Sequence, residues 1–187
     1  MKQYRTHEAF RDALPGYLER RSAELGVPTE LLRRRLVFQR FLARLLRVAP
    51  SRWVLSGGAA LDWRLSRSHA ARARTTVDLD FLYRATLDQA RADLAAATAI
   101  DLEDHFTFTV GPTSRAVEDG ARSFRFHLTA SIGPRAYLTF VIDIGVVDPL
   151  GWPPEQIVIA DPLDERGGLT VPTLPRASSR REGPRDH

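Results

Sequence analysis

Two aspartates that lie two residues apart, Asp78 and Asp80, are the first side chains in this sequence that could do chemistry. Their segment, Val-Asp-Leu-Asp-Phe, alternates as a β-strand does, and residues i and i+2 of a strand point to the same face. Two adjacent carboxylates repel each other unless a cation lies between them, and Mg²⁺ or Mn²⁺ prefers oxygen ligands. The spacing therefore indicates a metal site. An exposed edge strand with two solvated acids is the alternative.

Two glycines provide a second candidate feature. The segment Leu-Ser-Gly-Gly-Ala-Ala-Leu at 55–61 is typical of a strand that runs through a tight turn into a helix. Glycines let backbone N–H groups approach a phosphate, and a helix N-terminus favours the negative charge. Ser56, Gly57 and Gly58 are therefore candidate substrate-binding residues, with a plain turn as the alternative.

A third carboxylate, Asp143, lies in the strand-like segment Phe-Val-Ile-Asp-Ile. An acid between β-branched and aromatic neighbours is costly without a partner. It is a candidate third carboxylate of a two-metal site, in which one ion activates the attacking oxygen and the other holds the leaving group. An aspartate at the solvated rim of a sheet is the alternative.

Arg125 is predicted to lie beside Asp143 across a β-hairpin. Strands are expected at 122–130 and 136–147, with a turn at 131–135, and positions 125 and 143 share the parity that this register requires. The guanidinium could neutralise phosphate charge but could not donate a proton as a lysine can. An exposed strand arginine is the alternative.

The elements that position these residues form a mixed α/β arrangement. Helices are predicted at 6–25, at 30–48 with Thr29 as N-cap, from Ala59 onward, and at 87–98 behind a Thr86–Gln89 capping box. Further strands are expected at 53–55, 75–83 and 105–110, then a loop at 111–121 and an edge strand at 157–159. Strand pairs follow the helices rather than alternating with them, which predicts a mixed sheet flanked by helices.

Composition narrows the chemistry and the partners. The 187 residues include no cysteine, so thiolate ligands and cysteine nucleophiles are excluded. Lys2 is the only lysine among 27 Lys and Arg residues, so cationic roles fall to arginine, which binds phosphate in a fork. No apolar stretch is long enough to span a membrane and no signal segment opens the chain, so a cytoplasmic protein without a membrane partner is expected.

Arginines gather on the helix expected at 30–48. Residues 29–52 hold seven arginines against a single acid, Glu30, and four of the arginines recur at helical spacing: Arg33, Arg40, Arg44 and Arg47. This stripe is either a contact face for RNA or an acidic partner, or a solvated helix face. A second basic segment is the loop at 66–74, whose last residue, Arg74, is a candidate phosphate ligand or a loop arginine in water.

Three segments resemble the AbiEii/AbiGii-type nucleotidyltransferase toxins, the group that includes the MenT toxins. They are Trp-Val-Leu-Ser-Gly-Gly-Ala-Ala-Leu at 53–61, Arg-Thr-Thr-Val-Asp-Leu-Asp-Phe at 74–81 and Val-Ile-Asp-Ile-Gly-Val-Val-Asp-Pro at 141–149. The resemblance extends from about residue 6 to residue 175. It implies the α/β (α+β) fold of nucleotidyltransferases related to DNA polymerase β, a mixed sheet flanked by helices.

The resemblance also implies a function. The chain would be a toxin of a toxin–antitoxin or phage-defence pair, transferring NMP from an NTP to RNA, with the tRNA 3′ end as the first candidate acceptor. A cognate, AbiEi-like antitoxin would neutralise it. Gly57 and Gly58 would contact the triphosphate, and Mg²⁺ or Mn²⁺ would bind to the three aspartates Asp78, Asp80 and Asp143.

The chain departs from the family pattern in two side chains and at its C-terminus. Ser56 stands where many relatives carry a lysine, and Arg125 stands where they carry a catalytic basic residue, often lysine. Relatives continue past Leu174-Pro175 into a helical region, whereas a basic tail at 176–187, expected to be disordered, ends this chain. The expectation is a C-terminally truncated member with one nucleotidyltransferase domain at 1–175, comprising N-terminal helices at 6–50 and a catalytic core at 51–150.

Two other functions remain open at this point. An inactive truncated homologue could act only as an antitoxin- or RNA-binding module, through the arginine stripe and the 66–74 loop. Transfer to a protein or small-molecule hydroxyl is the other. The five histidines show no metal-ligand spacing, and His69 and His127 are only distant candidates for substrate contact.

Overall fold

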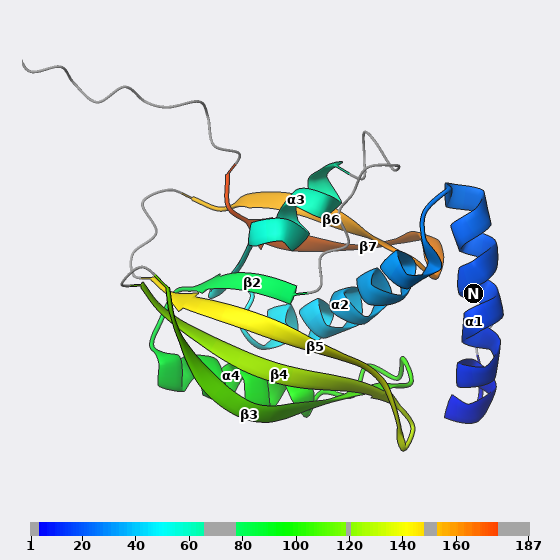
Figure 1. Ribbon diagram of the computed structural model, residues 1–187, viewed down its shortest axis with the longest axis horizontal. Helices are drawn as coiled ribbons and strands as arrows, with labels where there is room; N and C mark the ends of the chain where they lie inside the picture. Colours follow the sequence, from blue (N-terminus) through cyan, green and yellow to red (C-terminus); the bar gives the residue numbers. More distant parts are fainter. Residues whose placement is uncertain (1–3, 66–77, 119–120, 148–152, 176–187) are drawn as a thin grey trace, which may run out of the picture.

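A seven-stranded mixed sheet forms the centre of the molecule (Figure 1). The computed structural model describes residues 4–65, 78–118, 121–147 and 153–175. The strand order is β3-β4-β5-β2-β1-β7-β6. The strands are β1 (Trp53–Ser56), β2 (Asp78–Tyr83), β3 (Phe106–Glu118), β4 (Ala121–Ile132), β5 (Arg135–Val146), β6 (Glu155–Asp161) and β7 (Asp164–Thr173).

Four helices flank this sheet: α1 (His7–Leu25), α2 (Thr29–Val48), α3 (Gly57–Leu65) and α4 (Leu87–Thr98). Helices α2 and α4 lie together against one face, and α1 stands at the end of the sheet where α2 begins (Figure 1). A mixed sheet flanked by helices is the predicted fold class, which is therefore confirmed. No helix in the described ranges is long and apolar enough to cross a membrane.

Strand pairing is parallel at only two places in the sheet. Strand β2 pairs in parallel with β5, and β1 in parallel with β7, while the other neighbours are antiparallel. The parallel β2–β5 pair joins the segments that carry Asp80 and Asp143. It therefore decides whether the predicted carboxylates meet.

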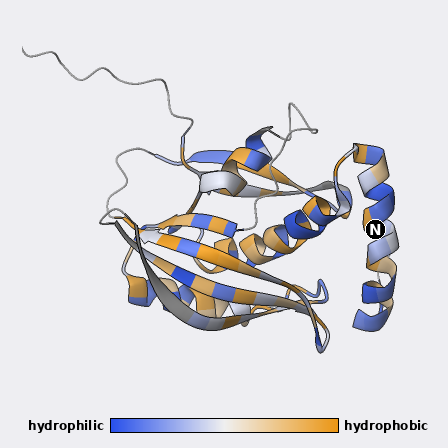
Figure 2. Ribbon diagram, in the orientation of Figure 1, coloured by the Kyte–Doolittle hydropathy of each residue, from blue (hydrophilic) through white to orange (hydrophobic). Residues whose placement is uncertain are grey.

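Aromatic side chains fill the space between the sheet and the helices. Phe41 of α2 packs on Phe108 and Phe140, with ring centroids 5.4 and 5.5 Å apart, and all three side chains are buried. Along β2 and β5 buried residues alternate with more exposed ones, and Figure 2 shows hydrophilic positions between hydrophobic ones on these strands. One face of the sheet is thus committed to the core and the other carries the polar residues.

Several predicted boundaries need correction. The predicted loop at 111–121 is wrong, because β3 runs to Glu118 and β4 begins at Ala121. Gly111 and Pro112 would break a regular strand, but here the register shifts between Val110 and Thr113 and a β-bulge absorbs them. The turn predicted at 131–135 is shorter, since Ile132 already pairs with Arg135.

Near the C-terminus the sequence analysis predicted one strand and missed another. Strand β6 at the sheet edge confirms the predicted edge strand, but β7 was missed because its sequence, Asp-Glu-Arg-Gly-Gly-Leu-Thr-Val-Pro-Thr, is rich in glycine and proline. Pairing with β6 over most of its length, and with β1 at Leu55↔Thr173, holds it in the sheet. Tertiary pairing here overrides a weak local preference.

Of the two predicted helix caps, the one at Thr86 is confirmed and the one at Thr29 is wrong. Thr86 accepts a hydrogen bond from Gln89 N at the start of α4, and Thr6 caps α1 in the same way by accepting one from Ala9 N. Thr29 is the first residue of α2 and not its cap; Pro28 holds that position without a side-chain hydrogen bond. Pro28 lacks a capping oxygen, so α2 depends on its buried face for stability.

Two of the four arginines in the α2 stripe are turned into the protein. Arg44 is fully buried, donates to Asp104 Oδ1 at 2.7 Å and Oδ2 at 2.9 Å, and lies 4.9 Å from the centroid of the Phe108 ring. Arg40 pairs with Asp161 at 2.9 Å. Both interpretations drawn from the spacing, a binding face and a solvated face, are therefore wrong for these two residues. Helical spacing identifies a shared face but not what covers it.

Candidate active site

Four polar residues form a row across the centre of the sheet. Ser56 of β1 lies opposite Asp80 of β2, Asp80 opposite Asp143 of β5, and Asp143 opposite Arg125 of β4. Directly opposed residues in neighbouring strands share a face and lie about 5 Å apart. Four segments that are distant in the sequence thus place their candidate side chains side by side.

The alternation of β2 decides which way its acids point. Leu79, Phe81 and Tyr83 are buried against the helices, so Asp78 and Asp80 point to the opposite face of the sheet. Asp78 lies one row further along, opposite Val141. The prediction that both carboxylates share the polar face is confirmed.

Gly57 fits against the Asp80 carboxylate. Its φ is +61°, and a Cβ atom at this position would lie only 1.9 Å from Asp80 Oδ2. The Gly58 N–H donates a hydrogen bond to the same carboxylate. β1 runs directly into α3 at Gly57, so the separate turn predicted before a helix at Ala59 does not exist. The two glycines therefore bring the N-terminus of α3 against the acidic row.

Arg125 and Asp143 form the bidentate pair that the hairpin register predicts. Arg125 Nε donates to Asp143 Oδ1 at 2.9 Å and Nη2 donates to Oδ2 at 2.7 Å. The arginine side chain is 42% exposed and the aspartate side chain 20%. The pair sits at the solvent-facing side of the sheet, where a ligand can reach the guanidinium.

The remaining carboxylates carry excess negative charge. Burial raises the pKa of Asp80, the charges of Asp143 and Asp78 raise it further, and the Gly58 N–H and Arg125 oppose them. Burial and Asp143 likewise raise the pKa of Asp78, against Arg125, Arg34 and His127. Raised pKa values from neighbouring acids mean that a cation would be stabilising here.

The chemical type of these carboxylates fits a hard divalent ion, but the distances between them do not yet form a metal site. Carboxylate oxygens on one face are the ligands that Mg²⁺ and Mn²⁺ prefer, and the raised pKa values of Asp78 and Asp80 fit a cation beside them. Across the described ranges, however, no three His, Cys, Asp or Glu side chains are grouped closely enough to hold a metal. Asp143 would have to exchange Arg125 for the ion.

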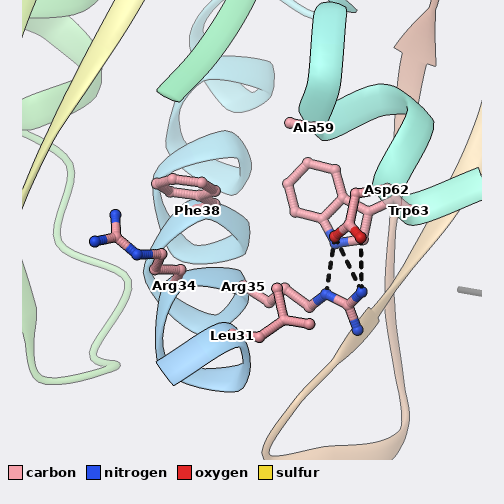
Figure 3. Close-up of a pocket in the computed structure, with 7 residues that line it drawn as sticks. All are labelled: Leu31, Arg34, Arg35, Phe38, Ala59, Asp62 and Trp63. Carbon is pink, nitrogen blue, oxygen red and sulfur yellow. Dashed lines mark hydrogen bonds and ion pairs between the residues drawn. The ribbon is translucent and has the colours of Figure 1, made fainter. Parts of the chain in front are cut away.

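An ion pair between two helices holds the glycine end of the site in place. Arg35 of α2 contacts both carboxylate oxygens of Asp62 of α3 at 3.0–3.1 Å, and the two side chains are largely buried (Figure 3). The pair fixes α3, and with it Gly57 and Gly58, against α2. Sequence reasoning missed this pair; its only signal was an acid on the helix behind the glycines.

The other candidate residues divide into those that the structure describes and those that it does not. His127 is exposed on β4 opposite Val141, in the row of Asp78, and is one of the charges acting on that acid. Arg74, His69, the 66–74 loop and the tail at 176–187 lie outside the described residues.

Comparison of the sequence with known protein families identifies the family of this chain. The family model described as nucleotidyl transferase AbiEii toxin of type IV toxin–antitoxin systems matches residues 40–179. That span covers well over half of the 187 residues and includes every strand of the sheet. The chain belongs to the AbiEii family. A search of curated proteins found no match.

AbiEii membership confirms the resemblance drawn from the three segments. All strands of the Ser56–Asp80–Asp143–Arg125 row lie within the matched residues. The family is one of nucleotidyltransferase toxins in type IV toxin–antitoxin systems, and such a system implies an antitoxin as partner.

Proposed function

We propose that this AbiEii protein transfers NMP from an NTP to an RNA hydroxyl with the help of Mg²⁺ or Mn²⁺, with the tRNA 3′ end as the first candidate acceptor. The observation that carries the proposal is the Ser56–Asp80–Asp143–Arg125 row, with the N-terminus of α3 against it. Phosphoryl transfer needs positioning and charge neutralisation more than a covalent protein nucleophile, and this row offers groups for both. These substrates would place the protein in the cytoplasm.

Each part of the row has a role in the proposed reaction. The Gly57 N–H, at the start of α3, would donate a hydrogen bond to a phosphate oxygen of the nucleotide, and the Gly58 N–H would do so after exchanging Asp80 for the phosphate. Arg125 would neutralise charge on the phosphate that is attacked, and its half-exposed position leaves it accessible. Ser56 lies beside Asp80 and would contribute a hydroxyl to the same phosphates.

A divalent ion would supply Lewis-acid stabilisation of the phosphate and of the leaving pyrophosphate. Asp78 and Asp80 are the residues that would hold it, joined by Asp143. Their raised pKa values fit this role because burial, and then the charge of Asp143, disfavours the ionised carboxylates when no cation is beside them.

The competing proposal of a pure binding module loses much of its support. It relied on the α2 arginines as a contact face, but Arg44 is buried and Arg40 is paired with Asp161. Transfer to a protein or small-molecule hydroxyl uses the same row and would be separated by the choice of acceptor.

A labelling experiment tests the proposal. The protein is incubated with each α-labelled NTP, Mg²⁺ or Mn²⁺ and total tRNA, and label in RNA is measured. We expect transfer by the wild type and a loss of more than about 100-fold for Asp80→Asn, as for loss of a charge-stabilising group. Asp88→Asn makes the same change on an aspartate whose side chain is 94% exposed, and should transfer normally. Absence of wild-type transfer to RNA, or equal transfer by Asp80→Asn, would refute it.

A further inference from the structure

Arg64 of α3 is a largely buried cation that contacts the C-terminal strands of the sheet. Its side chain is 12% exposed, and its Nη2 donates hydrogen bonds to the Thr173 hydroxyl, at the end of β7, and to the Leu174 carbonyl. The same nitrogen lies 3.0 Å from Glu155 Oε2 of β6. Thr173 is fully buried, so this contact joins α3 to the interior of the sheet, and Figure 1 shows α3 beside β6 and β7.

The same two residues at the end of β7 also hold the strand that leads into α3. Thr173 pairs in parallel with Leu55 of β1, and the Leu174 N–H donates to the Leu55 carbonyl at 3.2 Å. Leu55 lies two residues before Gly57, where α3 begins, and Arg64 is the last residue but one of this helix. The end of β7 therefore contacts the chain on both sides of Gly57, through β1 before it and through Arg64 after it.

Helix α2 holds α3 from the opposite side. Asp62, two residues before Arg64, forms the ion pair with Arg35 of α2 at 3.0–3.1 Å. Successive residues of an α-helix are rotated by about 100°, so side chains two positions apart point in nearly opposite directions. Ion pairs on two sides thus fix the direction of the α3 axis between α2 and the end of β7.

This direction matters because the first turn of α3 lies against the acidic row. A Cβ atom on Gly57 would lie 1.9 Å from Asp80 Oδ2, and the Gly58 N–H donates to the same carboxylate. A helix of nine residues is not stable by itself in water, so its tertiary contacts determine where its first N–H groups point. Hydrogen bonds weaken steeply when the donor is misdirected. A tilt at the far end of α3 would therefore weaken any phosphate contact at its start.

We propose that Arg64 is a positioning residue for the nucleotide: through Thr173 and Leu174 it holds α3 so that the N–H groups of the first turn point at the phosphates beside Asp80. This inference rests on the proposed function and deepens it, because it makes the end of β7 a part of the nucleotide site. Arg64 lies about 10 Å along the helix axis from Gly57. It therefore acts through α3 and not on the phosphates directly.

Titration of non-hydrolysable NTP analogues in Mg²⁺ tests the proposal, and tRNA binding is measured separately. We expect Arg64→Gln to bind the tightest analogue roughly 10-fold more weakly, the loss for one misplaced hydrogen bond to a charged group. Thr173→Val removes the buried hydroxyl at similar volume and should weaken analogue binding in the same direction. Because both changes remove one shared contact, the double variant should lose no more than Arg64→Gln alone. Binding of tRNA should not change.

Two further variants separate positioning from general stabilisation. Arg40, 19% exposed, pairs with Asp161 at the other end of the β6–β7 hairpin. Arg40→Gln should therefore lower the unfolding temperature but leave analogue binding unchanged. Arg64→Lys keeps the charge and can still donate to β7, so it should recover part of the affinity lost in Arg64→Gln. Glu155→Gln should bind as the wild type, because the Glu155 side chain is 48% exposed and an exposed ion pair contributes little.

Three outcomes would overturn the inference. They are a folded Arg64→Gln that binds analogues as tightly as the wild type, equal losses of affinity in Arg64→Gln and Arg40→Gln, and no analogue binding by the wild type. Thermal unfolding checks the fold of each variant, and if Arg64→Gln is unfolded, the affinity of folded Thr173→Val decides. A wild type that binds analogues with the help of Arg64 but transfers nothing to RNA would refute the proposed function and leave this inference standing.

Discussion

At the scale of single residues, the site depends on how closely Gly57 and Asp80 approach each other. The carboxylate fills the space in which any other residue would place its Cβ atom. The positive φ of Gly57 adds a backbone conformation that side-chain-bearing residues rarely adopt. Position 57 therefore requires glycine for two independent reasons. The first of them, the close approach of Asp80, also sets the position of a proposed metal ligand.

Replacing Gly57 with alanine should therefore damage both stability and activity. We expect Gly57→Ala to lower the free energy of unfolding by about 1–3 kcal/mol, because it combines a strained φ with a clash. Nucleotide transfer should fall further, because Asp80 must move. Gly16→Ala is the control, since a Cβ there meets nothing closer than 3.9 Å and lies within α1. Urea unfolding and the labelling assay measure the two effects; normal transfer by a folded Gly57→Ala would contradict this account.

The charge of Asp80 gives a second prediction, on pH. Burial and neighbouring acids raise its folded-state pKa above the ordinary 3.8. The stability linked to this group is therefore full below that ordinary value and is lost as pH rises through the folded-state pKa. In EDTA at pH 7, Asp80→Asn should thus be more stable than the wild type, by on the order of 1 kcal/mol.

This gain should shrink as pH falls toward 4, and urea unfolding at several pH values measures it. Asp88→Asn, at an exposed position, should show no such trend. A difference independent of pH, or a less stable Asp80→Asn at pH 7, would speak against crowding of negative charge around Asp80.

At the scale of elements, helix α2 is packed inside the fold, and its arginines form ion pairs with acids of other segments. Its arginines reach partners on different sides of the fold: Arg44 reaches Asp104 and Arg40 reaches Asp161. The Arg44 guanidinium also donates to the carbonyls of Ile100 and Phe106. A fully buried cation is tolerated because all five of its N–H donors are used.

Removing that cation should be costly. Arg44→Ala leaves Asp104 without its main partner and two carbonyls without donors, and should lower the free energy of unfolding by about 3–5 kcal/mol. The exposed Arg47 of the same helix is the control, and Arg47→Ala should change the free energy of unfolding by less than about 0.5 kcal/mol. Denaturant titration compares the two. Equally small losses of stability in Arg44→Ala and Arg47→Ala would mean that the buried Arg44–Asp104 pair does not stabilise the fold.

At the scale of the whole molecule, the sheet order assembles the site. Asp80 and Asp143 become neighbours only because β5 inserts between β4 and β2 and pairs with β2 in parallel. The Arg35–Asp62 pair then ties α3 to α2. The N-terminal helices are thereby joined to the glycine end of the row.

Local pattern was enough to predict how the candidate residues are placed. Alternation along β2 placed Asp78 and Asp80 on one face, and hairpin parity paired Arg125 with Asp143, since both depend on a period of two along a strand. The cap at Thr86 and the mixed sheet follow from similarly local rules. These features depend on residues that are close together in the sequence, so the sequence alone determined them.

Tertiary structure decided what covers each face and what each charge meets. The spacing of Arg40 and Arg44 could not reveal that the fold would bury them against Asp161 and Asp104, because those partners come from distant segments. β7 likewise gains its strand conformation from its neighbours rather than from its glycine-rich sequence. Burial and pairing of this kind are properties of the assembled chain.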